Sequence, residues 1–211
     1  SCVGEPWNSV AVDRGDGVIL ASTSAIWNRG VEKLLAFRAP LLEDRRAEVE
    51  ALIRALHAAG ALAIDRDQQG DVAQLLAREE YIGLPADIIA RALSGRLLPR
   101  RDAPVRHIRD FLVLHREAAN FPWRSQAMWL YSQMVRWGHA PLNAEGFEAA
   151  ANVFRPDVYR AALAGTGAIL PNASAKVEGA IDRPLGASSV SGRLIMGPDR
   201  FFDGMLFDPD R

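Results

Sequence analysis

The residues with the clearest chemical potential stand in one turn, Val3-Gly4-Glu5-Pro6-Trp7-Asn8. A glycine before a Glu-Pro pair lets a chain leave a strand and enter a helix that has proline in its first turn. Backbone N–H groups at a helix start lack partners within the helix and can bind a small anion. Alternatively, the turn binds no anion and Glu5 only complements the helix dipole. The turn therefore predicts either an anion site or an ordinary helix start.

Residues able to perform covalent or metal chemistry are scattered. No serine stands in a glycine-flanked elbow, and the single cysteine, Cys2, has no plausible histidine partner. Gly15-Asp16-Gly17 lacks the third glycine, the following helix and the acidic residue of a dinucleotide site. The chain has four histidines, and they are not spaced as zinc ligands are: His57, His107, His115 and His139. We expect no enzyme activity, no catalytic residue, no metal and no cofactor.

Composition restricts the partners of this chain of 211 residues. Its 25 basic and 26 acidic residues give a formal net charge of −1, so little positive charge is left for phosphate contacts with nucleic acid. No run of 18 apolar residues occurs, so insertion into a membrane is not expected. A chain of this length can bury one sizeable core without metals or cross-links. These features predict a single α/β unit over residues 1–211.

Lysine is rare in the chain, because all but two of its 25 basic residues are arginine. The exceptions are Lys33 and Lys176. A compact ammonium differs from a guanidinium as an ion-pair donor, so a lysine retained in such a sequence merits attention. The aromatic residues Trp123, Trp129, Tyr131 and Trp137 fall at helical spacing, which is typical of a packed core face and less often of a stacking platform.

Periodicity in the first half of the chain predicts short strands followed by helices. Apolar runs at 10–12, 18–21 and 34–37 favour strands and turns, with one helical piece near 25–27. Pro40 begins a helix whose apolar residues recur at three- and four-residue steps, and Gly60 is expected to end it. Further helices are expected over 70–78 and from Pro85 to Gly95.

The second half is expected to be helical up to an irregular end. The arginine-rich stretch 97–109 is interpreted as an exposed connection, and 111–115 as a short strand. A long helix from Pro122 to Gly138, apolar on most faces, should be central, and two short helices follow over 144–154 and 156–163. Residues 168–211 are predicted to form an irregular tail that docks through aromatic side chains. The fold class is α/β and helix-rich.

Six motifs follow one another along the chain: Cys2-Val3-Gly4-Glu5-Pro6-Trp7-Asn8, Ile26-Trp27, Glu32-Lys33, Asn120-Phe121-Pro122-Trp123, Gln133-Met134-Val135-Arg136-Trp137-Gly138 and Phe207-Asp208-Pro209. Together, and in this order, they resemble the motifs of the nitrate and bicarbonate solute-binding proteins of ABC transporters. The resemblance implies the C-terminal part of a type II periplasmic-binding fold with two lobes and a ligand cleft between them. Family members are roughly twice as long, so Ser1 is expected to be an interior cut.

The resemblance also implies a function and a site. Gly4, Glu5, Pro6 and Trp7 are placed at the cleft, together with Lys33 as a buried ammonium that favours nitrate or nitrite over bicarbonate with calcium. The alternative for Lys33 is a surface lysine that caps a turn after Gly30. The expected protein is a periplasmic solute-binding component that hands its anion to an ABC permease. The alternative is a cytoplasmic nitrate sensor that regulates an RNA-binding antiterminator protein.

Overall fold

The computed structural model describes residues 2–211 and divides the chain into two compact units. Unit 1 comprises residues 1–25 and 57–116, and unit 2 comprises residues 26–56 and 117–211. Each unit is therefore built from two separate stretches of chain. The sequence predicted one α/β unit, and the number of independently folding domains stays a prediction.

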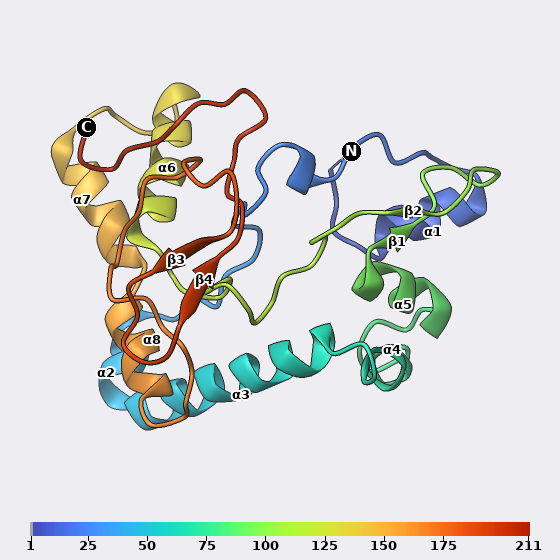
Figure 1. The fold of residues 1–211 in the computed structure, drawn as a ribbon, viewed down its shortest axis with the longest axis horizontal. Coiled ribbons are helices and arrows are strands. Elements are labelled where there is room, and N and C mark those ends of the chain that lie inside the picture. Colours follow the sequence, from blue (N-terminus) through green and yellow to red (C-terminus); the bar gives the residue numbers. More distant parts are fainter. Residues whose placement is uncertain (1) are drawn as a thin grey trace. The chain divides into compact units, whose positions relative to one another are not determined.

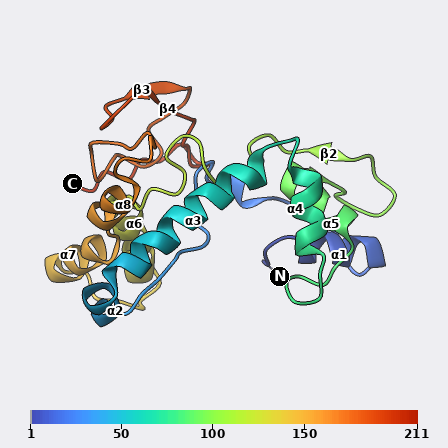
Figure 2. The same ribbon diagram turned by 90° about the horizontal axis from the view of Figure 1, so that it is seen from below.

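Among the described residues, unit 1 contains α1, α4, α5, the C-terminal end of α3 and a short hairpin (Figure 1). Helix α4 packs against α5, and α5 also contacts α1, as both ribbon views show (Figures 1 and 2). A bidentate ion pair between Arg91 of α5 and Asp13 of α1 joins these helices and holds the pKa of the Asp13 carboxyl below its usual range. The elements are α1 (Trp7–Arg14), the 3-10 turn η1 (Thr23–Ala25), α4 (Gln69–Leu76), α5 (Ala86–Ser94), β1 (Arg96–Leu97) and β2 (Arg106–His107).

The strands predicted for unit 1 at 10–12, 18–21 and 111–115 are wrong, and residues 18–21 form no strand. The run at 10–12 lies within α1, because Ser9 and Val12 are both buried at a helical spacing of three and Gly15 ends the helix with φ 81°. The run at 111–115 pairs with no strand, and Asp110, with φ 54°, bends the chain directly before it. The stretch 97–109 is a connection only in part, since β1 and β2 pair there in antiparallel register.

Unit 2 combines helices with a small hairpin and long connecting segments (Figures 1 and 2). One core cluster joins Val49 and Ile53 of α3 to Val158 and Leu163 of α8. A second cluster joins the segment before α6 to β4 through Phe121, Trp123, Leu194 and Met196. The elements are α2 (Ala39–Asp44), α3 (Arg46–Ile64), which continues into unit 1 at His57, α6 (Arg124–Arg136), α7 (Ala144–Val153), α8 (Pro156–Leu163), β3 (Leu185–Ala187) and β4 (Leu194–Met196).

Three further predictions need correction, one at the end of α3 in unit 1 and two in unit 2. Gly60 does not end α3, because the strong helix formers Ala61, Leu62 and Ala63 continue it. The end of α6 is not central, since Met134 and Trp137 are exposed. The segment 168–211 is not irregular throughout, because β3 and β4 pair within it. No helix among residues 2–211 is both long and apolar enough to cross a bilayer.

Candidate functional site

The turn that carries the predicted anion site lies in unit 1, at the start of α1. Pro6 is the N-cap residue, and the N–H of Trp7 donates to the Gly4 carbonyl over 3.3 Å. The N–H of Ser9 donates to Oε2 of Glu5, also over 3.3 Å. Glu5 thus occupies one of the donors that an anion would use. This geometry is that of an ordinary helix start, in which the Glu5 carboxylate complements the helix dipole.

Lys33 lies in unit 2 and is not buried as predicted. Its side chain is 80% exposed, and Nζ lies 2.9 Å from Oε1 of Glu32. An ion pair this exposed contributes about 0–1 kcal/mol. Because Lys33 and the turn of Gly4 to Trp7 belong to different units, the structure describes each by itself. Their shared role as anion ligands stays a prediction.

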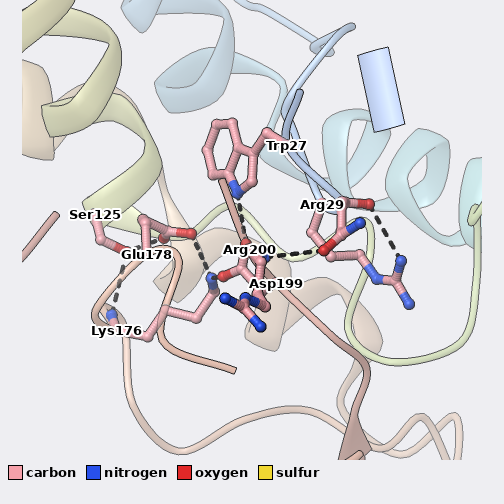
Figure 3. Close-up of polar contacts among 8 residues, drawn as sticks. Trp27, Arg29, Ser125, Lys176, Glu178, Asp199 and Arg200 are labelled. Atoms are coloured by element: carbon pink, nitrogen blue, oxygen red, sulfur yellow. Dashed lines mark hydrogen bonds and ion pairs between the residues drawn. The ribbon is translucent and has the colours of Figure 1, made fainter. Parts of the chain in front are cut away.

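The strongest polar cluster in unit 2 is one that the motifs did not predict (Figure 3). Lys176 forms ion pairs with both Glu178 and Asp199, whose side chains are 0% and 1% exposed. Its ammonium lies between the two carboxylates (Figure 3). The second carboxylate oxygen of Asp199 accepts from Nε1 of Trp27 at 2.5 Å. We call these residues, with Ser125, the buried charge cluster.

Ser125 connects the buried charge cluster to the start of α6. Its hydroxyl donates to Oε1 of Glu178 over 2.6 Å and accepts from the backbone N–H of Lys176 over 3.1 Å. Every member except Lys176 is buried, and the Lys176 side chain is only 14% exposed. A cluster closed to solvent cannot receive a solute, so its role is to hold residues 176–199 against α6 and Trp27. The rarity of lysine was the only signal in the sequence that pointed to it.

The pKa of Glu178 is raised from its ordinary 4.5 to about 7, chiefly because burial disfavours the charged carboxylate. Lys176 lowers this pKa and Asp199 raises it. Between pH 4.5 and 7 the folded chain therefore holds a proton that the unfolded chain has released. By linkage, this group lowers the free energy of unfolding as pH rises through that interval and adds no further change above it.

We expect Glu178→Gln to remove this pH dependence. Urea unfolding between about pH 4.5 and 7 should show the wild type losing stability relative to the Gln variant as pH rises. The neutral amide keeps an acceptor for Ser125 and carries no titratable proton. Parallel stability profiles for the two proteins over this interval would contradict the raised pKa of Glu178.

Two histidines of unit 1, His57 and His115, come into contact. His57 lies within α3, seven residues before the helix ends, so the helix dipole does not favour its charged form there. Burial lowers the pKa of His57, and His115, whose ring centroid is 4.4 Å away, lowers it further. Among residues 2–211, no three His, Cys, Asp or Glu side chains are grouped so that they could hold a metal ion.

Comparisons with known proteins match this chain over different shares of its length. The model of the NMT1-like family matches residues 1–77. The nitrate import ATP-binding protein NrtC of Synechocystis sp. PCC 6803 is 32% identical over 158 residues, which are 75% of this chain and 24% of that protein. The nitrate/nitrite binding protein NrtA of Synechococcus elongatus is 26% identical over 209 residues, which are 99% of this chain and 43% of that protein.

The fold is shared with a solved structure. The crystal structure of the periplasmic nitrate-binding protein NrtA from Synechocystis PCC 6803 matches with a TM-score of 0.83 at 22% identity, covering 99% of this chain and 50% of that one. The chain therefore has the helix-rich α/β fold of a periplasmic binding protein. The predicted resemblance to the nitrate and bicarbonate solute-binding family is confirmed. The chain spans about half the length of the NrtA proteins that it matches.

Proposed function

We propose that this chain supplies part of a binding site for a small planar oxyanion, nitrate or nitrite, in the solute-binding component of an ABC import system. The observation that carries the proposal is its similarity over 99% of its length to a nitrate/nitrite binding protein. The solved relative is described as periplasmic, which supports the same location for this protein. The similarity to an ATP-binding nitrate import protein supports a transport complex as its partner.

The proposed mechanism is binding without covalent chemistry. Solute-binding proteins of this fold class capture a ligand between lobes that close by hinge motion. Gly4 to Trp7 would contribute backbone donors at the start of α1, and Lys33 would contribute positive charge. Because Glu5 already accepts from Ser9, anion binding at the turn would require this carboxylate to move or to lose its hydrogen bond.

Isothermal titration calorimetry of the purified full-length protein tests the proposal. We expect saturable heat with nitrate or nitrite and none that requires calcium. Bicarbonate with calcium is the comparison ligand. The absence of heat with nitrate, nitrite and bicarbonate, each with and without calcium, would refute the proposed function.

We expect Lys33→Ala to weaken nitrate binding by more than tenfold without loss of folding. The exposed side chain stabilises the fold little, and its ammonium is the charge available to the anion. Glu32→Gln is the matched control, because it removes the carboxylate that now pairs with Lys33 and should leave nitrate affinity equal or higher. Calorimetric titration of both variants with nitrate measures the two affinities. Nitrate affinity of Lys33→Ala within about threefold of wild type, or about 0.7 kcal/mol, would exclude Lys33 as a ligand.

A further inference from the structure

A short segment of unit 2, residues 26–28, is fixed against the distant residues 200–202. The two segments form an antiparallel bridge between Trp27 and Phe201. One backbone hydrogen bond on each side of this bridge, of 2.8 and 3.1 Å, joins the segments. The Ile26-Trp27 motif therefore lies where the chain is held by residues far along the sequence.

The Trp27 side chain is 5% exposed, and its indole has both polar and aromatic partners. Nε1 donates to Oδ1 of Asp199 at 2.5 Å, and the other oxygen of that carboxylate pairs with Lys176 (Figure 3). The indole ring centroid lies 4.8 Å from that of Phe201 and 4.7 Å from that of Trp129. A hydrogen bond to a charged acceptor is stronger than one between neutral groups, so Asp199 fixes the position of the indole.

Trp27 also begins the turn that leads to Lys33. The N–H of Gly30 donates to the Trp27 carbonyl over 3.3 Å, and a Cβ added to Gly30 would lie 3.3 Å from Cε3 of the indole. In the same turn Arg29 forms an ion pair with Glu117, and the two side chains are 13% and 20% exposed. Lys33 follows Gly30 by three residues, so the chain between them spans at most about 11 Å. The anchored turn thus limits where the Lys33 ammonium can lie.

The chain after this turn has fewer contacts. Within the described part of the protein, the backbone of residues 31–36 forms no hydrogen bond with other backbone groups. Phe37 then packs against the core cluster of α3 and α8. Lys33 pairs with Glu32, which belongs to the same stretch and so cannot fix its position. Within unit 2, the position of Lys33 is therefore set by the anchor at Trp27 on one side and by Phe37 on the other.

We propose that Trp27 is a positioning residue for oxyanion binding. Through its hydrogen bond to Asp199 and its contact with Gly30, it holds the chain so that the Lys33 ammonium reaches the bound anion. A binding group that is already held loses less conformational freedom when its ligand arrives, and this raises affinity. The role rests on the proposed function, because it needs Lys33 to be a ligand. The buried charge cluster thereby acts on binding although it is closed to the solute.

Trp27→Phe tests this role, because it removes the Nε1 donor and part of the ring beside Gly30 but keeps an aromatic ring. We expect calorimetry of the full-length protein to show nitrate binding at least fivefold weaker in this variant. Trp123→Phe is the matched control, since Trp123 is also a buried tryptophan of unit 2, at 4% exposure, but packs in the second core cluster. It should change nitrate affinity by less than twofold even where it lowers stability.

A double variant tests whether Trp27 acts through Lys33. In a Lys33→Ala background, Trp27→Phe should cause no further loss of nitrate affinity, because the effects of coupled residues do not add. Equal losses with and without Lys33, or an equal effect of Trp123→Phe, would show a purely structural role and overturn the proposal. Nitrate binding by Trp27→Phe within twofold of wild type overturns it as well, without affecting the proposed function. No nitrate binding by the wild type would refute the proposed function and the role of Trp27 with it.

Amide hydrogen exchange of the ligand-free protein gives a second measurement, which needs no nitrate affinity in the Lys33 variant. Trp27→Phe should speed exchange at Asn28 and Gly30 at least tenfold, because their backbone hydrogen bonds belong to the anchor. Exchange in α8, which lies in the same unit, should stay unchanged. Unchanged exchange at Asn28 and Gly30, or an equal rise in α8, would overturn the proposal.

Discussion

Lys176→Met is expected to lower the free energy of unfolding by about 3–5 kcal/mol at pH 8, the cost of removing one partner from a buried ion pair. The substitution leaves Glu178 and Asp199 buried with no cation, and both are closed to solvent. Methionine has nearly the volume of the lysine stem, so the loss reports charge and not a cavity. Urea unfolding measures it. The pH matters, because below about 7 Glu178 can take up a proton and reduce the cost.

Lys33→Met is the matched control, because Lys33 is the other lysine of the chain and its side chain is 80% exposed. It should change the free energy of unfolding by less than about 1 kcal/mol. If Lys176→Met does not fold, its effect can be measured in a background that carries Glu178→Gln and Asp199→Asn, where the unpaired charges are gone and the substitution should cost much less. Equal losses for Lys176→Met in the charged and neutral backgrounds would show that the buried charge cluster does not act through ion pairing.

Gly179→Ala is expected to cost about 2–5 kcal/mol. Gly179 is buried with φ 86°, a left-handed conformation that costs a residue with a Cβ about 1–2 kcal/mol. A Cβ there would also lie 2.7 Å from the backbone carbonyl oxygen of Met205 and 2.7 Å from the ring of Phe201. Relief of such overlap adds about 1–3 kcal/mol. Urea unfolding again provides the measurement.

Gly165→Ala separates the two contributions to the cost at Gly179. Gly165 has a similar φ of 74°, but no atom lies within 4 Å of an added Cβ. This variant should lose only the conformational part, about 1–2 kcal/mol. Equal losses at the two glycines would mean that the close approach of Met205 and Phe201 adds nothing.

Local signals in the sequence predicted several helices closely. Pro85 and Gly95 bracket α5 as expected, and Gly95 ends it with φ 66°. Helix α8 spans Pro156–Leu163, the predicted range, because proline suits a first helical turn. These features depend on neighbouring residues only. Where the prediction was wrong, as at 10–12 and 111–115, an apolar run is compatible with several conformations and the packing partners decide among them.

The buried charge cluster was beyond prediction for a different reason. Trp27 and Asp199 are 172 residues apart, and no spacing rule relates them. The rarity of lysine directed attention to Lys33, which is exposed, as much as to Lys176, which is central to the cluster. Composition can mark an unusual residue, but only the fold shows which carboxylates surround it. For the candidate site, the motifs predicted the family. The hydrogen bond that Glu5 accepts from Ser9 and the exposure of Lys33 could be seen only in the structure.

The division of unit 2 into two distant stretches has a consequence for synthesis of the chain. Trp27 packs against Phe201 and Trp129 and donates to Asp199, so its environment is completed only when the last stretch has left the ribosome. At about 5–20 residues per second, the interval between Trp27 and Asp199 is roughly ten to thirty seconds. During that time residues 26–56 have been synthesised, but residues 117–211, which form most of unit 2, have not. The second stretch of unit 1, residues 57–116, emerges in between.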